Sequence, residues 1–195
     1  MDFLLILPLN YTFMLVEKNK IIIKGKVFTK LFEESQILTE IKTLSLLLEE
    51  YYRDKNPLVL VVLKGAYVFA GEFLKFWTFP MELDFIRYQS YIGAQSQGKI
   101  QNPIPIPLIE KNRHILILED IVDSGLTLKE IRKDLEKFFP AGVRVASLLY
   151  KPDTLKYGSA PEHYCIEVQN QFLIGFGLDY DEKGRNLREL YALNI

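Results

Sequence analysis

The stretch Ile115-Leu116-Ile117-Leu118-Glu119-Asp120-Ile121-Val122-Asp123-Ser124-Gly125-Leu126-Thr127 decides the fold. Its first four residues form a continuously apolar run, as expected for a strand that is covered on both faces. The run ends in two adjacent carboxylates, Glu119 and Asp120, and Asp123 follows three residues later. In open parallel sheets, ligands bind outside the carboxyl ends of the strands, where the next helix presents unpaired N–H groups and the positive end of its dipole.

The segment from Ser124 to Thr127 supplies such a turn, with a glycine that permits close backbone approach and two hydroxyl groups. A phosphate group would fit at this position. The segment is not a Walker loop, because the chain contains no G-x-x-x-x-G-K-[ST] pattern. The alternative interpretation is an ordinary turn between a strand and a helix, with its acidic side chains in solvent.

On either side of this segment, apolar runs of strand length alternate with amphipathic stretches of helix length, which is typical of an α/β fold. The pattern predicts strands at about residues 58–63, 83–88 and 143–150, and helices at about 33–52, 69–76 and 127–139. It also predicts a hairpin or arm at 21–27, short strands at 164–168 and 172–176, and a turn at 179–184. The segment 90–101 is rich in Gly, Ser and Gln and predicts a mobile surface loop. Prolines at 103, 105 and 107 predict an extended segment after it.

The composition indicates one domain without disulfides. The chain has 195 residues, a single cysteine, and 24 basic against 25 acidic side chains, which give a formal net charge of -1. One cysteine excludes an intramolecular disulfide and fits a reducing compartment, so we expect a cytoplasmic protein. The near-zero charge argues against nonspecific binding of nucleic acid. We expect no membrane association, because no segment reaches the length of about 20 apolar residues that spans a bilayer.

The apolar beginning of the chain, from Phe3 to Val16, leaves three interpretations open. It could be a signal peptide, although Asp2 stands where such peptides carry positive charge and Pro8 interrupts the run. It could be a strand or a disordered extension. It could also precede the natural start of translation, with Met14 as the first residue.

The segment 116–127 resembles the phosphoribosyl-pyrophosphate-binding motif of type I phosphoribosyltransferases, in the form carried by bacterial hypoxanthine (guanine) members of the family. Further segments occur in the order of the same family: 63–67, 84–91, 146–151, and 172–187. The resemblance covers about residues 28–193. It implies a mainly parallel sheet flanked by helices, with a small hood over the base site. Residues 1–27 would be an N-terminal extension and arm, and 28–195 the phosphoribosyltransferase domain, with the hood formed mainly by about 152–195.

The resemblance implies an enzyme of purine salvage, which transfers 5-phosphoribose from phosphoribosyl pyrophosphate to N9 of hypoxanthine and/or guanine and releases pyrophosphate. Asp123 would be the general acid/base at N7 of the purine. The residues that would bind phosphoribosyl pyrophosphate are Lys64, Gly65, Glu119, Asp120, Ser124, Gly125, Leu126, Thr127 and Arg185. A cis peptide bond often precedes the lysine of the 63–67 loop in this family.

The resemblance also assigns the purine site, the metal and the lid. The purine-binding residues would be Lys151 at the 6-oxo group, Phe172 stacked on the base, the backbone of Leu173, and Asp179. Mg²⁺ would be held by Glu119, Asp120 and Asp179, because hard oxygen ligands suit this ion. Ser90 and Tyr91 would belong to a lid that excludes water from the transition state.

Three purely structural interpretations are alternatives to these roles. The pair Lys64-Gly65 could be a solvated strand end, Lys151 a surface lysine beside Pro152, and Phe172 one of many core aromatic residues. Whether hypoxanthine, guanine or xanthine is preferred stays open.

Three other functions are alternatives to the salvage enzyme. A regulatory nucleotide-binding protein of the same fold would add a DNA-binding module or a basic face, and the chain has neither. A general nucleotide-binding module would need no acid at Asp123. A xanthine-preferring phosphoribosyltransferase is the third. The family usually forms dimers or tetramers, so we expect a homodimer or homotetramer.

Overall fold

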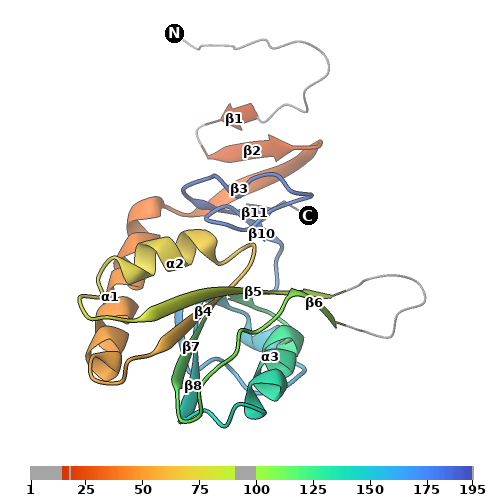
Figure 1. Cartoon of the computed structure of the whole chain (residues 1–195). Helices are drawn as coiled ribbons and strands as arrows, with labels where there is room; N and C mark the ends of the chain where they lie inside the picture. The colour runs from red at the N-terminus through yellow and green to blue at the C-terminus, as the bar shows by residue number, and fades with distance from the viewer. Residues whose placement is uncertain (1–14, 18, 91–99, 195) are drawn as a thin grey trace.

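The computed structural model describes residues 15–17, 19–90 and 100–194, which form a large sheet and a small sheet with helices against the large one (Figure 1). The large sheet has the strand order β6-β5-β4-β7-β8-β9, and all its neighbours are parallel except β5 and β6. Its strands are β4 (Leu58–Val62), β5 (Glu82–Ser90), β6 (Ile100–Ile104), β7 (His114–Val122), β8 (Gly142–Tyr150) and β9 (His163–Glu167). The helices are α1 (Glu34–Tyr52), α2 (Tyr67–Leu74) and α3 (Leu126–Glu136), with a 3₁₀ turn at Pro152–Thr154.

The central strands are buried on both faces, which explains their continuous apolar sequence. Alternate residues of β4 point to opposite faces. Val59 and Val61 pack in the cluster that contains α1 and α2, whereas Leu58 and Leu60 pack in the cluster that contains α3. Figure 1 shows the same division, with α1 and α2 on one side of the large sheet and α3 on the other. The predicted α/β class and the parallel sheet are therefore confirmed.

The small sheet combines strands from both ends of the chain. Its antiparallel order is β1-β2-β3-β11-β10, with β1 (Leu15–Glu17), β2 (Lys20–Ile23), β3 (Lys26–Phe32), β10 (Leu173–Ile174) and β11 (Leu190–Leu193). The predicted hairpin at 21–27 turns at Lys24 and Gly25, whose φ angles of 48 and 74 suit a tight two-residue turn. The expected boundary between the N-terminal arm and the phosphoribosyltransferase domain, at residues 27 and 28, lies within β3. This strand pairs with β11 along the sheet.

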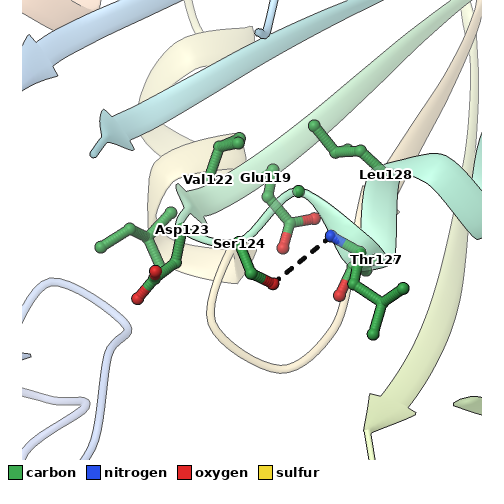
Figure 2. Close-up of a pocket in the computed structure, with 9 residues that line it drawn as sticks. Glu119, Val122, Asp123, Ser124, Thr127 and Leu128 are labelled. Carbon is green, nitrogen blue, oxygen red and sulfur yellow. Dashed lines mark hydrogen bonds between the residues drawn. The ribbon is translucent and has the colours of Figure 1, made fainter. Parts of the chain in front are cut away.

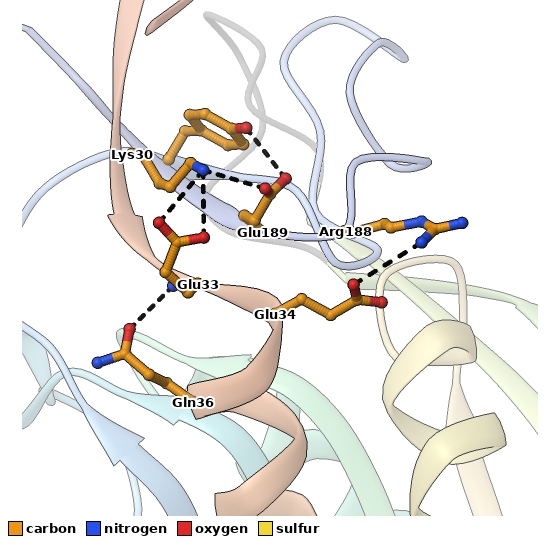
Figure 3. A network of polar contacts seen from close by, with 7 residues as sticks. Lys30, Glu33, Glu34, Gln36, Arg188 and Glu189 are labelled. Carbon is orange, nitrogen blue, oxygen red and sulfur yellow. Dashed lines mark hydrogen bonds and ion pairs between the residues drawn. The ribbon is translucent and has the colours of Figure 1, made fainter. Parts of the chain in front are cut away.

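A polar network joins the small sheet to the first helix (Figure 3). Lys30 on β3 donates to both carboxylate oxygens of Glu33, at 3.3 and 3.2 Å, and to Glu189 before β11, at 3.1 Å. Glu33 begins α1 with a capping box, in which its backbone N–H donates to Gln36 at 2.9 Å. The small sheet is thus anchored on the end of α1.

Several predicted boundaries differ from the structure. The helix predicted at 127–139 ends at Glu136, because Phe139 has a φ of 50 and its carbonyl accepts from Asn112. The strand that starts at His114 continues past Leu118 to Val122, since β8 offers it partners along that length. The loop predicted at 90–101 is shorter, because Ser90 ends β5 and residues 100 and 101 pair with β5 as part of β6. Residues 91–99 lie outside the described residues, as do 1–14 with the interpretations of the N-terminus.

Candidate active site

The turn between β7 and α3 forms an open pocket lined by Glu119 and by residues 121–128, both polar and apolar (Figure 2). Gly125 caps α3 in the left-handed conformation, with φ 79, and the Ser124 hydroxyl accepts from the Leu126 N–H at 3.4 Å. A Cβ at Gly125 would overlap the carbonyl oxygen of Tyr157. The Tyr157 N–H in turn donates to the Ser124 carbonyl at 3.0 Å. This packing holds the turn at the N-terminus of α3, and a helix N-terminus suits an anion.

The two adjacent carboxylates line different pockets, yet they interact with each other, since Asp120 contributes after burial to the raised pKa of Glu119. Glu119 lines the pocket of the turn, and its Oε2 is buried without a hydrogen-bond partner in the part of the chain that the structure describes. Asp120 lines a neighbouring larger cleft and lies against Gly65, where a Cβ would overlap its carboxylate. Burial raises the pKa of Glu119 well above its ordinary value and that of Asp120 to about 6. Glu119 is therefore not a solvated acid, and that interpretation is wrong for this residue.

Asp123 and Lys151 form an ion pair at the ends of two neighbouring parallel strands. Lys151 Nζ donates to Asp123 Oδ2 at 3.0 Å. Only 6% of Lys151 is exposed, so it is not a solvated surface lysine, whereas half of the Asp123 side chain faces the cleft. Burial raises the pKa of Asp123, but hydrogen bonds from Thr154 and Lys151 outweigh it, and the net shift is downward. Asp123 is therefore ionised at neutral pH.

The loop after β4 meets the turn that precedes the last strand. The Leu63–Lys64 peptide bond is cis, as the resemblance implied. A Cβ at Gly177 would overlap the Gly65 carbonyl oxygen, so the two loops are in direct contact. Lys64 Nζ binds both carboxylate oxygens of Glu182 at 3.0 Å. Lys64 is thus a half-exposed cation that is paired with Glu182.

Arg185 and Asp179 are coupled on the same side of the site. Arg185 donates to the Gly177 carbonyl at 2.9 Å, and its Nη2 lies 2.6 Å from Asp179 Oδ1. The other oxygen of Asp179 accepts from the Glu182 N–H at 2.7 Å. Asp179 and Asp120 line the same cleft.

An aromatic side chain from the small sheet forms one wall of the cleft. Phe172 is 47% exposed, which excludes the core-aromatic interpretation, and it rests on Phe28 and Tyr180 with ring centroids 6.5 and 5.8 Å away. The Phe172 carbonyl accepts from Leu193. Because the backbone groups of an antiparallel strand alternate in direction, those of Leu173 point away from β11, at the free edge of β10. The cleft between this wall and Asp123 measures about 700 Å³, which is within the usual range for small-molecule sites.

The remaining predicted residues are placed as follows. Thr127 and Leu126 form the first turn of α3 and line the pocket with Gly125. Ser90 is the last residue of β5, and Tyr91 lies outside the described residues. No three acidic, His or Cys side chains come together into a metal cage among the described residues. In the same part of the chain, no helix is long and apolar enough to cross a bilayer.

Comparison with known proteins identifies the fold that builds this cleft. The phosphoribosyl transferase domain family matches residues 29–181. The chain belongs to the phosphoribosyltransferase family. The hypoxanthine-guanine-xanthine phosphoribosyltransferase of Tritrichomonas foetus is 36% identical over 158 residues, which are 80% of this chain and 86% of that protein. The hypoxanthine-guanine phosphoribosyltransferase of Lactococcus lactis subsp. lactis is 38% identical over the same shares of the two chains.

Solved structures agree with this assignment. A hypoxanthine-guanine phosphoribosyltransferase from Bacillus anthracis superposes with a TM-score of 0.79 at 27% identity, over 87% of this chain and 99% of that chain.

Three residues of this phosphoribosyltransferase lie in the site although the sequence analysis gave them no role. Glu182 contacts Lys64 and Arg185, Thr154 lowers the pKa of Asp123, and the Tyr157 backbone packs against Gly125. All three act through contacts between segments distant in sequence. The sequence signal that was available is weak: an acidic residue between Asp179 and Arg185, and a polar residue shortly after Lys151.

Proposed function

We propose that this phosphoribosyltransferase transfers the 5-phosphoribosyl group from phosphoribosyl pyrophosphate to N9 of hypoxanthine and/or guanine, giving IMP and/or GMP and pyrophosphate. The observation that carries the proposal is the Asp123–Lys151 pair, 3.0 Å apart, at the cleft that Phe172 walls. In a 6-oxopurine, O6 and N7 lie side by side on one edge of the base. When N7 carries a proton, this edge presents an acceptor beside a donor, and a buried ammonium beside an ionised carboxylate is complementary to it.

Lys151 supplies the preference for an oxo group. An ammonium has three hydrogen-bond donors and no acceptor, so it pairs with O6 of hypoxanthine or guanine. Adenine presents an amino donor at the same position and offers the ammonium no acceptor there. The relatives in Lactococcus lactis and Tritrichomonas foetus carry names that specify these same oxopurines.

Asp123 manages the purine proton. Bond formation at N9 puts positive charge on the imidazole ring, which makes a proton on N7 acidic. The Asp123 carboxylate, with its pKa held below the ordinary value, is ionised and accepts that proton, while Lys151 keeps it oriented. Phe172 stacks on the base, and the backbone of Leu173 offers its outward N–H and C=O to the base edge.

Phosphoribosyl pyrophosphate would lie along the turn before α3 and the two loops that carry Lys64 and Arg185. The amides of the α3 turn, from Ser124 to Thr127, bind the 5-phosphate. Glu119 and Asp120, near the end of β7, hold the ribose hydroxyls. Lys64 and Arg185 bind the pyrophosphate group on the far side.

The oxygen donors of the site fit a Mg²⁺ ion that arrives with the substrate. Asp120 and Asp179 line one cleft, and Glu119 has a buried oxygen without a partner among the described residues. Mg²⁺ typically binds one or two carboxylates together with substrate phosphates and water, so no cage of protein ligands is needed. Bound there, the ion would neutralise the leaving pyrophosphate.

We also propose that the protein is cytoplasmic and forms a homodimer or homotetramer. A solved structure of a Trypanosoma cruzi relative concerns the oligomeric state of that protein.

The test is nucleotide formation from phosphoribosyl pyrophosphate and Mg²⁺ with hypoxanthine, guanine, xanthine or adenine in turn. We expect turnover of hypoxanthine or guanine and none of adenine. Asp123→Asn is the matched variant, because it keeps the shape of the side chain and removes the base; its kcat should fall by about 10²-fold or more. Turnover of xanthine alone would favour a xanthine-preferring enzyme. Binding of phosphoribosyl pyrophosphate without turnover of any purine would favour a regulatory protein.

A further inference from the structure

The two cations at the far side of the site are already in contact with an anion of the chain itself. Lys64 Nζ donates to both carboxylate oxygens of Glu182 at 3.0 Å, and Arg185 Nη2 donates to Oε2 of the same carboxylate at 3.4 Å. One carboxylate therefore bridges a lysine and an arginine from two different loops. Lys64 and Glu182 are 118 positions apart in the sequence. A phosphate oxygen pair would make the same two contacts.

The contacts of Glu182 are weaker and more exposed than the neighbouring contact of Arg185. The side chains of Glu182 and Lys64 are 60% and 43% exposed, whereas Arg185 and Asp179 are 21% and 25% exposed and only 2.6 Å apart. Solvent-exposed ion pairs contribute little to stability. The Arg185–Asp179 pair thus builds the turn, and the Glu182 contacts can be exchanged without unfolding it.

The turn that carries Glu182 is shaped to present it. Tyr180 and Lys183 exchange backbone hydrogen bonds of 2.9 and 3.1 Å, so Asp181 and Glu182 are the two corner residues. Both corners have positive φ, 50 and 63, a geometry that favours Asn-Gly rather than Asp-Glu. A long acidic side chain at this corner is unfavourable locally, and its contacts to the two cations compensate for that. The pKa of Glu182 is lowered, first by the hydrogen bond from Lys64, so the side chain is charged at neutral pH.

We propose that Glu182 is an internal competitor for pyrophosphate: its carboxylate neutralises Lys64 and Arg185 in the free protein, is displaced when the pyrophosphate group of the substrate binds, and returns to assist release of pyrophosphate. The proposal rests on the proposed function, because it takes these two cations as the pyrophosphate site. It assigns to Glu182 a tuning of substrate and product affinity, with no part in the chemical step.

The experiment compares the full chain with Glu182→Gln, which keeps the size of the side chain and its backbone hydrogen bond but removes the charge. Inorganic pyrophosphate with Mg²⁺ is titrated calorimetrically, and the KM for phosphoribosyl pyrophosphate is measured alongside. Both the Kd and the KM should fall by about threefold to tenfold, the range of two exposed ion pairs. Glu82→Gln is the control, since it removes an equally exposed carboxylate, paired with Arg113 at the first residue of β5.

A double-mutant cycle with Lys64→Ala separates exchange of contacts from a general change of charge. In the Lys64→Ala background, Glu182→Gln should improve pyrophosphate binding much less. An unchanged or weaker affinity in Glu182→Gln, or an equal gain in Glu82→Gln, overturns the proposal. Failure of the wild type to form nucleotide would instead refute the proposed function, whereas the pyrophosphate titration decides the role of Glu182 without turnover.

Discussion

Replacing Gly125 by alanine should destabilise the turn between β7 and α3, for two reasons whose costs can be added. The residue has φ 79, where an L side chain costs about 1–2 kcal/mol. Its Cβ would also overlap the Tyr157 carbonyl oxygen and the Leu155 side chain, and such overpacking costs about 1–3 kcal/mol. The lower entropy of the unfolded alanine chain returns about 0.4–1 kcal/mol. We therefore expect the free energy of unfolding to fall by about 2–4 kcal/mol.

The assay is urea denaturation, followed by titration of the folded variant with phosphoribosyl pyrophosphate. Gly71→Ala is the matched control, because Gly71 lies inside α2 with open space around a new Cβ. That substitution should stabilise the protein by about 0.5–1 kcal/mol. The folded Gly125→Ala variant should bind phosphoribosyl pyrophosphate more weakly, since the turn must shift away from Tyr157. If Gly125→Ala is as stable as the wild type and binds equally well, the assigned role of this turn is refuted.

Three further predictions concern single side chains. Lys151→Met should lower kcat/KM for hypoxanthine by about 10²-fold. It should also raise the pKa of Asp123, so that the acid limb of the pH profile moves to higher pH; an unmoved limb would contradict the pairing. Glu162 accepts hydrogen bonds from Arg132 and from the Val145 N–H at 2.7 and 2.8 Å, so Glu162→Gln should reduce the free energy of unfolding by about 1–2 kcal/mol near pH 7. Because the pKa of Glu162 is lowered in the folded protein, that difference should shrink as the pH falls through the folded pKa, and a difference constant with pH would be evidence against the shift. Tyr52→Phe removes a buried hydrogen bond of 3.2 Å to the Ile115 carbonyl and should cost about 1 kcal/mol without changing kcat, measured by denaturation and turnover.

The sequence predicts the large sheet well, because each of its central strands is buried on both faces and leaves a continuous apolar run. The same reasoning locates Glu119 and Asp123, since polar residues at the end of such a run have no packing explanation. It also predicts the first helix, whose buried residues Ile37, Ile41, Leu44 and Leu48 recur at helical spacing.

The small sheet could not be predicted in the same way. β10 has two residues, too few for any periodicity, and the pairing of β3 with β11 joins opposite ends of the chain. The end of α3 depends on the positive φ of Phe139, which apolar spacing does not record. The contact of Glu182 with Lys64 likewise arises only when the tertiary structure brings the two loops together.

The position of β11 between β3 and β10 has a consequence for the order of folding. Thr29 on β3 donates a hydrogen bond of 2.8 Å to Asn194, which follows β11 and lies 165 positions later in the sequence. Closing a loop of that length costs more entropy than joining neighbouring strands, and pairings of high contact order form slowly. The parallel sheet with its phosphate turn contains mostly shorter connections and can assemble earlier. A refolding chain should therefore acquire the phosphate pocket before the aromatic wall, so that binding of the purine marks the completion of folding.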